Sequence, residues 1–575
     1  MTSAAPTAAS ATTPASATLR PRTGGQILAD QLRIHGVDLA FGVPGESYLA
    51  LLDALHDHRD AMRFIICRQE GGAANMADAY GKLTGRPGIC MVTRGPGATN
   101  ASIGVHTAFQ DSTPMILFIG QVARDYIDRE SFQEIDFRRF FGPFMSKWTA
   151  QIDSAARIPE YVSHAFHTAT SGRPGPVVLA LPEDMLTETA TVADARPWQR
   201  VQASPAAADL ERLHGLLARA KRPFVLLGGS GWTAQAVADI EAFARENRLP
   251  VGCAFRCQDL FDNRHSNYAG DVGVGINPAL AERLRNCDLL LAVGPRLGEM
   301  ATQGYTLFEV PRMKPALVHV HAGAEELGRV YQGDLLINAG MPQIAAALRA
   351  LPPLPAATTA GWAQWTADAH ADYLKALEPV NPPGEVNLSV VLRELRERLP
   401  DDAIVTNGAG NYAAWLHRFF DYRQYRTQLA PTSGAMGYGV PAAVAAGLVH
   451  PQRVVVAWNG DGCFMMNGQE MATAAQYGAK VIFCVVNNGM YGTIRMHQER
   501  EYPARVSGTE LKNPEFTLLA RAYGAHGELV ERTGQFGPAL ERCLAHDGPS
   551  LIELRTDPEA ITPRTTLSAL RAARR

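Results

Sequence analysis

The segment from Arg453 to Gly492 constrains the fold of this chain more than any other. It begins with a β-branched run, Val454–Trp458, continues through a stretch of helical composition, Met465–Tyr477, and ends with a second apolar run, Lys480–Val486. Two apolar strands joined by a helical crossover form a parallel βαβ unit that is buried on both faces. The carboxyl ends of such strands open into one crevice, where open α/β sheets bind ligands. We therefore expect an α/β fold with a ligand site at this crevice.

Both polar turns of this unit fall in the crevice. The first is Gly460–Gly462 and the second is Asn487–Gly489, and Asp461 and Asn488 lie 27 residues apart. That spacing accommodates one helix and one strand, so both side-chain oxygens can face the same point. Carboxylate, amide, carbonyl and phosphate oxygens are the ligands that a hard divalent cation prefers. The alternative, two turn-forming residues without a metal, explains either turn alone but leaves their joint spacing without a reason.

Composition and charge exclude several classes of function. A formal charge of −3 and a pI near 6.6 provide no general attraction to nucleic acid or to an anionic membrane. No apolar run approaches the roughly 20 residues of a membrane-spanning helix. The eight cysteines are scattered, and the close pair Cys253 and Cys257 has no second pair or histidine cluster for zinc. We expect reduced thiols and a cytoplasmic location, with no nucleic-acid or membrane partner.

The chain divides into three α/β blocks. Helical and strand patterns alternate in residues 23–187, 207–350 and 386–558, and polar, proline-containing linkers separate these blocks. The second linker, 351–385, contains one helical piece. Residues 1–22 are rich in Ala, Thr, Ser and Pro; we expect a disordered tail, with a transit peptide as the alternative. The basic end of the chain after Ala560 is expected to fray. The predicted fold is three doubly wound parallel-sheet domains.

The two turns carry a resemblance to a known family. The text WNGDGCFMMNGQEMATA, followed by VVNNGMYGTIR, resembles the thiamine-diphosphate-dependent enzymes, in particular the acetolactate synthase and benzoylformate decarboxylase group. The resemblance covers nearly the whole chain and implies that the three blocks are pyrimidine-binding, central and diphosphate-binding domains. It also implies that Asp461, Asn488 and the main-chain carbonyl of Met490 hold a magnesium ion, which clamps the diphosphate of the cofactor.

The resemblance assigns further cofactor contacts. It implies that Gly410, Asn411 and Tyr412 offer donors to the diphosphate, as does the turn containing Gly462 and Cys463, where the family usually has Ser in place of Cys463. In PTSGAMGYG, it implies that the carbonyl of Gly434 receives the 4′-amino group and that Met436 supports the bent cofactor. On residue type alone, Met436 is equally well an ordinary core side chain.

Glu70 is the predicted catalytic acid. It stands in RQEGGAANMADAYG, between the strand Phe64–Cys67 and a helix. On local sequence alone, Glu70 is a carboxylate at a helix N-terminus, which the helix dipole favours. The family resemblance implies instead that it shares a proton with the aminopyrimidine ring, so that the cofactor can act as its own general base. Family dimers place this glutamate and the GDG turn on different subunits, which implies a homo-oligomer.

Three positions depart from the biosynthetic acetolactate synthases and bear on substrate choice. Glu46 and Arg94 replace small residues, and either they pair with each other or Arg94 meets a substrate carboxylate. His497 replaces a tryptophan that favours 2-oxobutyrate as acceptor. In the central block the turn Gly228–Gly231 is compatible with FAD, but a lone glycine-rich turn is weak support, and the acidic H-I-D-I-D strand of the family reads His319–Gly323 here.

The sequence therefore predicts a decarboxylase and carboligase of 2-oxoacids, resembling acetolactate synthase, that joins pyruvate to an acceptor with release of CO2. One alternative is decarboxylation without carboligation, as in the benzoylformate branch; Glu70 and the metal turns serve both reactions equally. A distant alternative is a nucleotide-binding dehydrogenase, or a binding protein without catalysis, that uses Gly228–Gly231. It leaves Glu70, Asp461 and Asn488 without a joint explanation.

Overall fold

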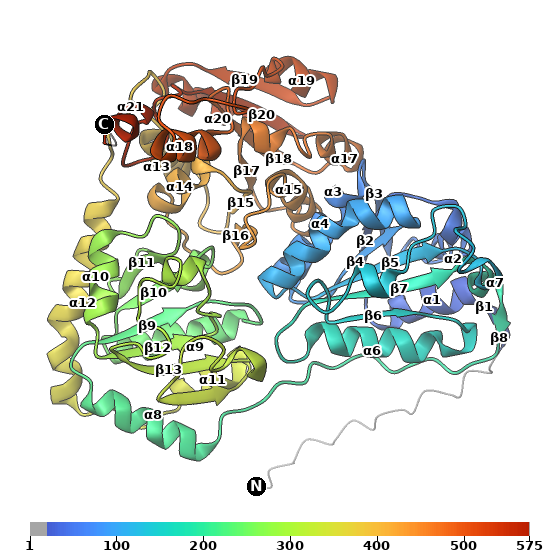
Figure 1. Cartoon of the computed structure of the whole chain (residues 1–575), viewed down its shortest axis with the longest axis horizontal. Helices are drawn as coiled ribbons and strands as arrows, with labels where there is room; N and C mark the ends of the chain where they lie inside the picture. The colour runs from blue at the N-terminus through green and yellow to red at the C-terminus, as the bar shows by residue number, and fades with distance from the viewer. Residues whose placement is uncertain (1–19, 574–575) are drawn as a thin grey trace, which may run out of the picture.

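A computed structural model describes residues 20–573 of the chain and shows three separate six-stranded sheets, each flanked by helices (Figure 1). Within each of these sheets all neighbouring strands pair in parallel. The predicted class, α/β with three parallel-sheet domains, is confirmed. Within the described residues no helix is both long and apolar enough to cross a lipid bilayer.

The N-terminal sheet has the order β3-β2-β4-β5-β7-β6. Its strands are β2 (Leu39–Gly42), β3 (Arg63–Ile66), β4 (Gly88–Val92), β5 (Met115–Gln121), β6 (Trp148–Gln151) and β7 (Pro176–Pro182). Its main helices are α1 (Gly24–Ile34), α2 (Leu49–His56), α3 (Glu70–Thr84), α4 (Gly95–Asp111) and α6 (Ile158–Thr170). The four inner strands β2, β4, β5 and β7 are buried because helices cover both faces of the sheet, whereas the edge strands β3 and β6 are partly exposed.

The predicted tail lies outside the described residues except at its end. Arg22, which we placed in the tail, belongs to β1 (Arg22–Thr23), which pairs antiparallel with β8 (Thr189–Ala190). Its buried guanidinium forms ion pairs with Asp30 and Asp194. Arg22 is therefore part of the first domain, because these two carboxylates hold it there.

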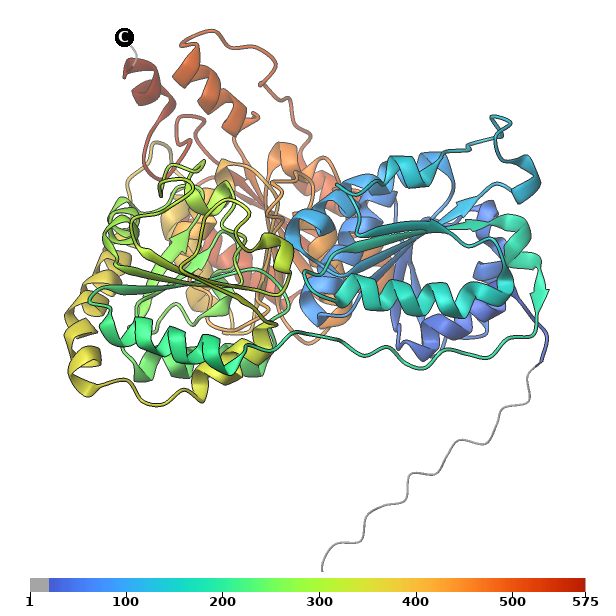
Figure 2. The same ribbon diagram turned by 60° about the horizontal axis from the view of Figure 1, so that its bottom comes forward.

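The central sheet has the order β11-β10-β9-β12-β13-β14. Its strands are β9 (Pro223–Leu227), β10 (Val251–Ala254), β11 (Tyr268–Val272), β12 (Leu289–Val293), β13 (Ala316–His321) and β14 (Leu335–Asn338). The main helices of this region are α8 (Ala207–Arg219), α9 (Ala234–Glu246), α10 (Pro278–Asn286), α11 (Met341–Arg349) and α12 (Ala356–Ala376). Figure 2 shows the extended segment that leads to this domain from the first one. The helical piece of the second linker is α12, and it packs on the central core through the buried side chains of Trp362 and Tyr373.

The C-terminal sheet has the order β16-β15-β17-β18-β20-β19. Its strands are β15 (Ile404–Asn407), β16 (Gln428–Leu429), β17 (Val455–Gly460), β18 (Val481–Asn487), β19 (His526–Val530) and β20 (Ser550–Arg555). Its helices include α13 (Leu388–Arg398), α14 (Asn411–Phe419), α15 (Gly439–Val449), α16 (Asp461–Phe464), α17 (Glu470–Tyr477), α18 (Gly492–Glu501), α19 (Phe516–Ala522), α20 (Phe536–Ala545) and α21 (Leu567–Ala572). Counted in chain order, the N-terminal and C-terminal sheets share one strand order, 2-1-3-4-6-5.

These two domains pack against each other through helices. Helix α3 lies against α15, and one cluster of buried side chains contains residues of both domains, among them Tyr80 on α3 and Val444 on α15 (Figure 1). Lys82, on α3, adds an ion pair with Asp78 of the same helix and a hydrogen bond to the hydroxyl of Tyr438. The first and last domains of the chain therefore share a core.

Two sequence predictions were wrong. The helix predicted over Met465–Tyr477 is interrupted, because residues 465–469 form turns between α16 and α17, where the Asn467 side chain donates to the carbonyl of Gly437. The end of the chain does not fray at Ile561: the buried side chains of Ile561 and Leu567 pack with Met490, and Arg571 pairs with Glu499. In both places contacts with distant residues decide the conformation.

Candidate cofactor site

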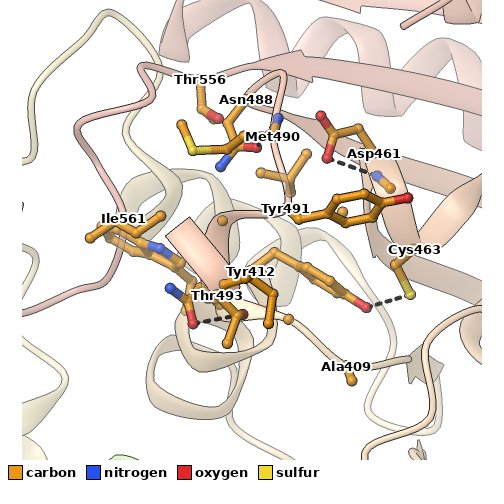
Figure 3. Close-up of a pocket in the computed structure, with 18 of the residues that line it drawn as sticks. Ala409, Tyr412, Asp461, Cys463, Asn488, Met490, Tyr491, Thr493, Thr556 and Ile561 are labelled. Carbon is orange, nitrogen blue, oxygen red and sulfur yellow. Dashed lines mark hydrogen bonds between the residues drawn. The ribbon is translucent and has the colours of Figure 1, made fainter. Parts of the chain in front are cut away.

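A cavity of about 250 Å³ lies at the carboxyl ends of β15, β17 and β18 (Figure 3). The neighbours β15 and β17 form the point where the strand order reverses, and ligands of such sheets bind there. Every residue predicted to touch the cofactor from the C-terminal domain lines this cavity: Gly410, Asn411, Tyr412, Gly434, Met436, Asp461, Gly462, Cys463, Asn488 and Met490. We call this cavity the cofactor pocket.

Asp461 is held firmly at the end of β17. Its Oδ1 accepts a hydrogen bond from the N–H of Gly462 at 2.8 Å, and its Oδ2 accepts from the N–H of Gly489 at 2.9 Å. The Nδ2 of Asn513 also donates to Oδ2, at 2.8 Å. Burial raises the pKa of the Asp461 carboxyl, and these hydrogen bonds oppose the rise. The bond to Gly489 joins the two turns that the sequence singled out, as the βαβ unit predicted.

The donor set fits magnesium. Asp461 offers carboxylate oxygens, the turn after β18 offers the amide oxygen of Asn488, and all three predicted ligands, with Met490, line the same pocket. Asn488 Oδ1 accepts one long bond, from the N–H of Met490 at 3.3 Å. Within residues 20–573 no cluster of three or more His, Cys, Asp or Glu could hold a metal. A cation here would therefore rely on hard oxygen donors and on the anion of a ligand, which is the preference of magnesium.

Cys463 and Tyr412 shape the floor of the pocket. The hydroxyl of Tyr412 lies 2.9 Å from the Cys463 sulfur, which also accepts a hydrogen bond from the N–H of Gly437 at 3.1 Å (Figure 3). The Tyr412 ring packs so closely on Gly410 that a Cβ there would lie 2.5 Å from a ring carbon, and the φ of Gly410, 151°, lies in the region that favours glycine. The sulfur of Cys463 thus accepts the hydrogen bonds that a serine hydroxyl would accept at this position.

The loop before α15 supplies the other wall of the pocket. Gly434 adopts a φ of 69°, and a Cβ added there would meet no heavy atom within 4 Å, so its backbone faces open space. Met436 lines the pocket and is half-buried against the core of the C-terminal domain. Gly434 therefore has the backbone freedom, and Met436 the bulk, that the sequence prediction requires. Their contacts with the cofactor remain predictions.

Glu70 begins α3 and does not line the cofactor pocket of its own chain. Gln69 caps the helix by accepting a hydrogen bond from the N–H of Gly72. Glu70 Oε2 accepts from Asn100 Nδ2 at 3.0 Å, and the carboxylate faces Gly97 on α4. Glu70 therefore lies at the carboxyl edge of the N-terminal sheet, away from Asp461 and Asn488.

The structure pairs Glu46 with Arg94. The guanidinium of Arg94 is buried and donates to Glu46 Oε1 at 3.0 Å and to Glu183 Oε2 at 2.5 Å. Both carboxylates face one cation, so the charge of Arg94 is already compensated. His497 lies on an exposed face of α18, where its Nδ1 contacts Arg500, and it does not line the cofactor pocket.

Several residues at the pocket were missed by the sequence interpretation. Asn513 binds Asp461, and the pocket is also lined by Tyr491, Thr493 and Ile561. Thr493 donates to Asn411 Oδ1 at 2.9 Å (Figure 3). Tyr491 and Thr493 directly follow the second turn, and this proximity in sequence could have suggested them. Asn513 and Ile561 carry no local signal.

Comparisons with known proteins agree with this geometry. Three family models match: the N-terminal TPP-binding domain of thiamine pyrophosphate enzymes at residues 22–140, the central domain at 210–351 and the C-terminal TPP-binding domain at 408–554. The chain is 30% identical to the acetolactate synthase isozyme 2 large subunit of Escherichia coli K12, over 93% of this chain and 95% of the relative. It belongs to the thiamine pyrophosphate enzyme family.

Two further relatives are also acetolactate synthase large subunits by name. The chain is 31% identical to the acetolactate synthase large subunit of Corynebacterium glutamicum, over 92% of this chain and 86% of the relative. It is 30% identical to the probable acetolactate synthase large subunit of Methanocaldococcus jannaschii, over 94% and 93%. The region matched by the N-terminal model contains Glu70, and the region matched by the C-terminal model contains Asp461 and Asn488. The cofactor pocket therefore lies in the domain that this enzyme family uses to bind thiamine diphosphate.

Proposed function

We propose that the protein is an acetolactate synthase, which decarboxylates pyruvate and joins the remaining two-carbon unit to a second 2-oxoacid. The observation that carries this proposal is the cofactor pocket, where the predicted cofactor contacts lie together in a chain about 30% identical to acetolactate synthase large subunits. When bound, thiamine diphosphate supplies a carbon nucleophile that can accept and later release the electrons of the broken C–C bond. The protein supplies binding, orientation and proton control.

The C-terminal domain would hold the cofactor. Asp461, Asn488 and the carbonyl of Met490 would bind magnesium and through it the diphosphate, since these groups line one wall of the pocket. Asn513 keeps Asp461 in place through its 2.8 Å hydrogen bond. The carbonyl of Gly434 would receive an amino group of the cofactor. Together these contacts would fix the cofactor in one orientation.

Proton control would come from a second chain. Glu70 would hold a proton at the pyrimidine ring, yet it is absent from the cofactor pocket of its own chain. Its immediate neighbours are Asn100 and Gly97, which leave its carboxylate at the edge of the N-terminal sheet. We infer a homo-oligomer in which Glu70 of one chain completes the pocket of another. A mixing experiment described below tests this inference.

The central domain fits a flavin poorly, and we assign no step to FAD. At the end of β13, where the acidic strand of the family would offer carboxylates, His321 stands with its ring bonded to the backbone of Gly323. We expect the purified protein to lack the visible absorbance band of flavin, and a spectrum with that band would contradict this assignment.

A reducing compartment suits the thiols. All eight cysteines are free, and all but Cys257 are buried. Burial raises the pKa of the Cys257 and Cys287 thiols to about 12, so these groups stay protonated and unreactive. We propose a cytoplasmic location on this ground.

The test is incubation of the cofactor-loaded protein with pyruvate, with pyruvate plus 2-oxobutyrate, and with benzoylformate, followed by identification of products by mass. Acetohydroxyacids are expected. Formation of aldehydes and CO2 alone would establish the decarboxylase without carboligation. Failure to bind thiamine diphosphate, together with tight binding of a nicotinamide nucleotide, would establish the dehydrogenase alternative.

A further inference from the structure

A second cavity, of about 650 Å³, adjoins the cofactor pocket. It lies between the three domains, and its walls include His106 from α4, Arg256 after β10, Arg296 after β12 and His417 on α14. It shares Ala409, Gly410, Asn411, Gly434 and Thr493 with the cofactor pocket. We call it the side cavity. A small molecule in the side cavity would lie directly beside the cofactor.

Arg256 carries an uncompensated charge in the wall of this cavity. Its side chain is buried, with 8% of the residue exposed, and its φ of 62° is unusual for a residue other than glycine. The guanidinium donates to the carbonyls of Pro431 and Gly408 and lies 4.7 Å from the centre of the Phe255 ring. In residues 20–573 no carboxylate lies within ion-pair distance of it. A buried cation without a counter-ion is costly.

The acidic groups that influence Arg256 electrostatically are paired elsewhere or only partly ionised. Asp111 forms an ion pair with Lys82 and accepts hydrogen bonds from Thr432. Burial raises the pKa of Asp271 to about 7, with Arg256 opposing the rise, so this carboxyl is a weak counter-ion at neutral pH. The other groups that influence Arg256, Tyr412 and Cys463, are uncharged at neutral pH because burial raises the pKa of each.

Arg256 has hydrogen-bonding capacity to spare. A guanidinium has five N–H donors, and Arg256 directs two of them to backbone carbonyls. Its buried Nε has no hydrogen-bond partner among the described residues. His417 lies beside it, with its ring edge-on to Phe255 and its Nε2 also without a partner in that part of the chain. Burial lowers the pKa of His417 to about 3, so its ring is neutral. This wall of the side cavity therefore offers one cation and one neutral imidazole.

We propose that Arg256 binds the carboxylate of the acceptor 2-oxoacid in the side cavity, with His417 as a neighbouring hydrogen-bond partner. The ligand is a small 2-oxo monocarboxylate, because one uncompensated cation matches one carboxylate and the adjoining cofactor pocket holds the reacting partner. Arg94, the candidate that the sequence offered, is already paired with two carboxylates. The assignment to an acceptor rests on the proposed acetolactate synthase activity.

The test compares oxamate, an unreactive isostere of pyruvate, with oxamide, its uncharged amide. Their dissociation constants are measured by calorimetry on cofactor-loaded protein, for the wild type and for Arg256→Met. In the wild type we expect oxamate to bind about ten- to a hundredfold more tightly than oxamide, as for hydrogen bonds to a charged group. In Arg256→Met this preference should fall to within about threefold, because removing either charge removes the same interaction.

Controls separate this role from a structural one. Arg296→Met removes the other arginine that lines the side cavity. Its guanidinium already pairs with Glu326, which Arg173 and Arg329 also contact, so the preference for oxamate should persist. Arg256→Lys should retain part of the preference and remains informative if Arg256→Met fails to fold. The dissociation constant of thiamine diphosphate, measured for each variant, shows separately whether the loops that contain Gly408 and Pro431 are intact. Equal binding of the two ligands to the wild type, or an unchanged preference in Arg256→Met, would overturn the proposal. A normal preference without acetohydroxyacid products would instead refute the proposed function.

Discussion

Glu470 Oε1 accepts a hydrogen bond from the backbone N–H of Gln69 at 3.0 Å. It also accepts from the N–H of Arg68 at 3.0 Å, while the Thr473 hydroxyl donates to Oε2 at 2.6 Å. Helix α17, which follows the metal turn, therefore holds the turn that carries Glu70 in the same chain. The two halves of the proposed catalytic machinery are joined within each chain, although they would serve different pockets in the proposed oligomer.

This contact predicts a pH-dependent stability. Burial raises the pKa of Glu470, so the folded state binds more protons than the unfolded state, and stability falls as the pH rises toward the raised pKa. Glu470→Gln keeps an oxygen for both N–H groups and removes the charge. We expect its melting temperature to equal or exceed that of the wild type at about pH 8 and to depend less on pH. Glu470→Ala should be destabilised at every pH, and equal losses in the two variants would contradict the assignment.

Glu70→Gln should retain thiamine diphosphate but lose activity, because an amide cannot exchange a proton with the pyrimidine ring. Loss of general acid–base assistance typically costs about 10²–10⁴-fold in rate. The measurement pairs the turnover of pyruvate with the dissociation constant of the cofactor. If Glu70→Gln turned over pyruvate as fast as the wild type, Glu70 would be only a helix-terminal carboxylate.

Mixing two inactive variants tests the shared pocket. If Glu70 and Asp461 act from different chains, Glu70→Gln and Asp461→Ala should complement each other after their subunits exchange. Random pairing into dimers makes half of them mixed, with one intact site of two, which gives roughly a quarter of the wild-type activity. Separate incubation of each variant is the control. Absence of recovery despite proven exchange would place both residues in one chain's site.

Asp461→Ala should release magnesium and thiamine diphosphate together, because it removes the carboxylate from the proposed metal site. Asn513→Ala provides the graded comparison, since it removes the 2.8 Å hydrogen bond that orients Asp461. Loss of such a supporting contact typically weakens metal affinity by about 10–100-fold. Both constants can be measured by calorimetry at matched magnesium. An unchanged cofactor affinity in Asp461→Ala would remove Asp461 from the site.

Cys463 should tolerate serine better than alanine. Its sulfur accepts from the Tyr412 hydroxyl and the Gly437 N–H, and serine offers an oxygen to the same donors. Alanine would leave both buried donors without a partner, at a cost of about 1–3 kcal/mol each. We expect Cys463→Ala to lower the melting temperature and Cys463→Ser to bind thiamine diphosphate at least as tightly as the wild type. Equal stability of the two variants would exclude the sulfur as an acceptor.

His497→Trp should leave the preference for 2-oxobutyrate over pyruvate as acceptor unchanged, because position 497 lines neither the cofactor pocket nor the side cavity. The wild type should show no strong preference, because an imidazole on an exposed helix face gives little grip on one additional methyl group. One methylene in an apolar pocket is worth roughly 1–3 kcal/mol of discrimination. A competition assay with both oxoacids gives the ratio of the two products. A strong 2-oxobutyrate preference in the wild type would mean that another side chain provides this grip.

The sequence by itself determined the fold class and the identity of the cofactor pocket. The apolar runs around Val456 and Val485 become buried parallel strands, because only a sheet covered on both faces can hide such runs. The sequence separation between Asp461 and Asn488 predicts that they lie close together, because both follow the carboxyl ends of adjacent parallel strands. The apolar pattern of the strands and the polar residues at their ends were thus enough to predict the fold class and the position of the pocket.

Only the tertiary structure decided which other residues reach the site. Asn513 meets Asp461 across 52 residues, and Arg256 meets Gly408 across 152. The break after α16 and the burial of Ile561 depend likewise on distant contacts. No periodic pattern in the chain encodes such pairs, because they depend on how separately folded layers dock. The surroundings of Arg256 could not be predicted for the same reason. Its hydrogen-bond acceptors are backbone carbonyls, which any residue type provides, so the sequence does not show that this arginine has no counter-ion.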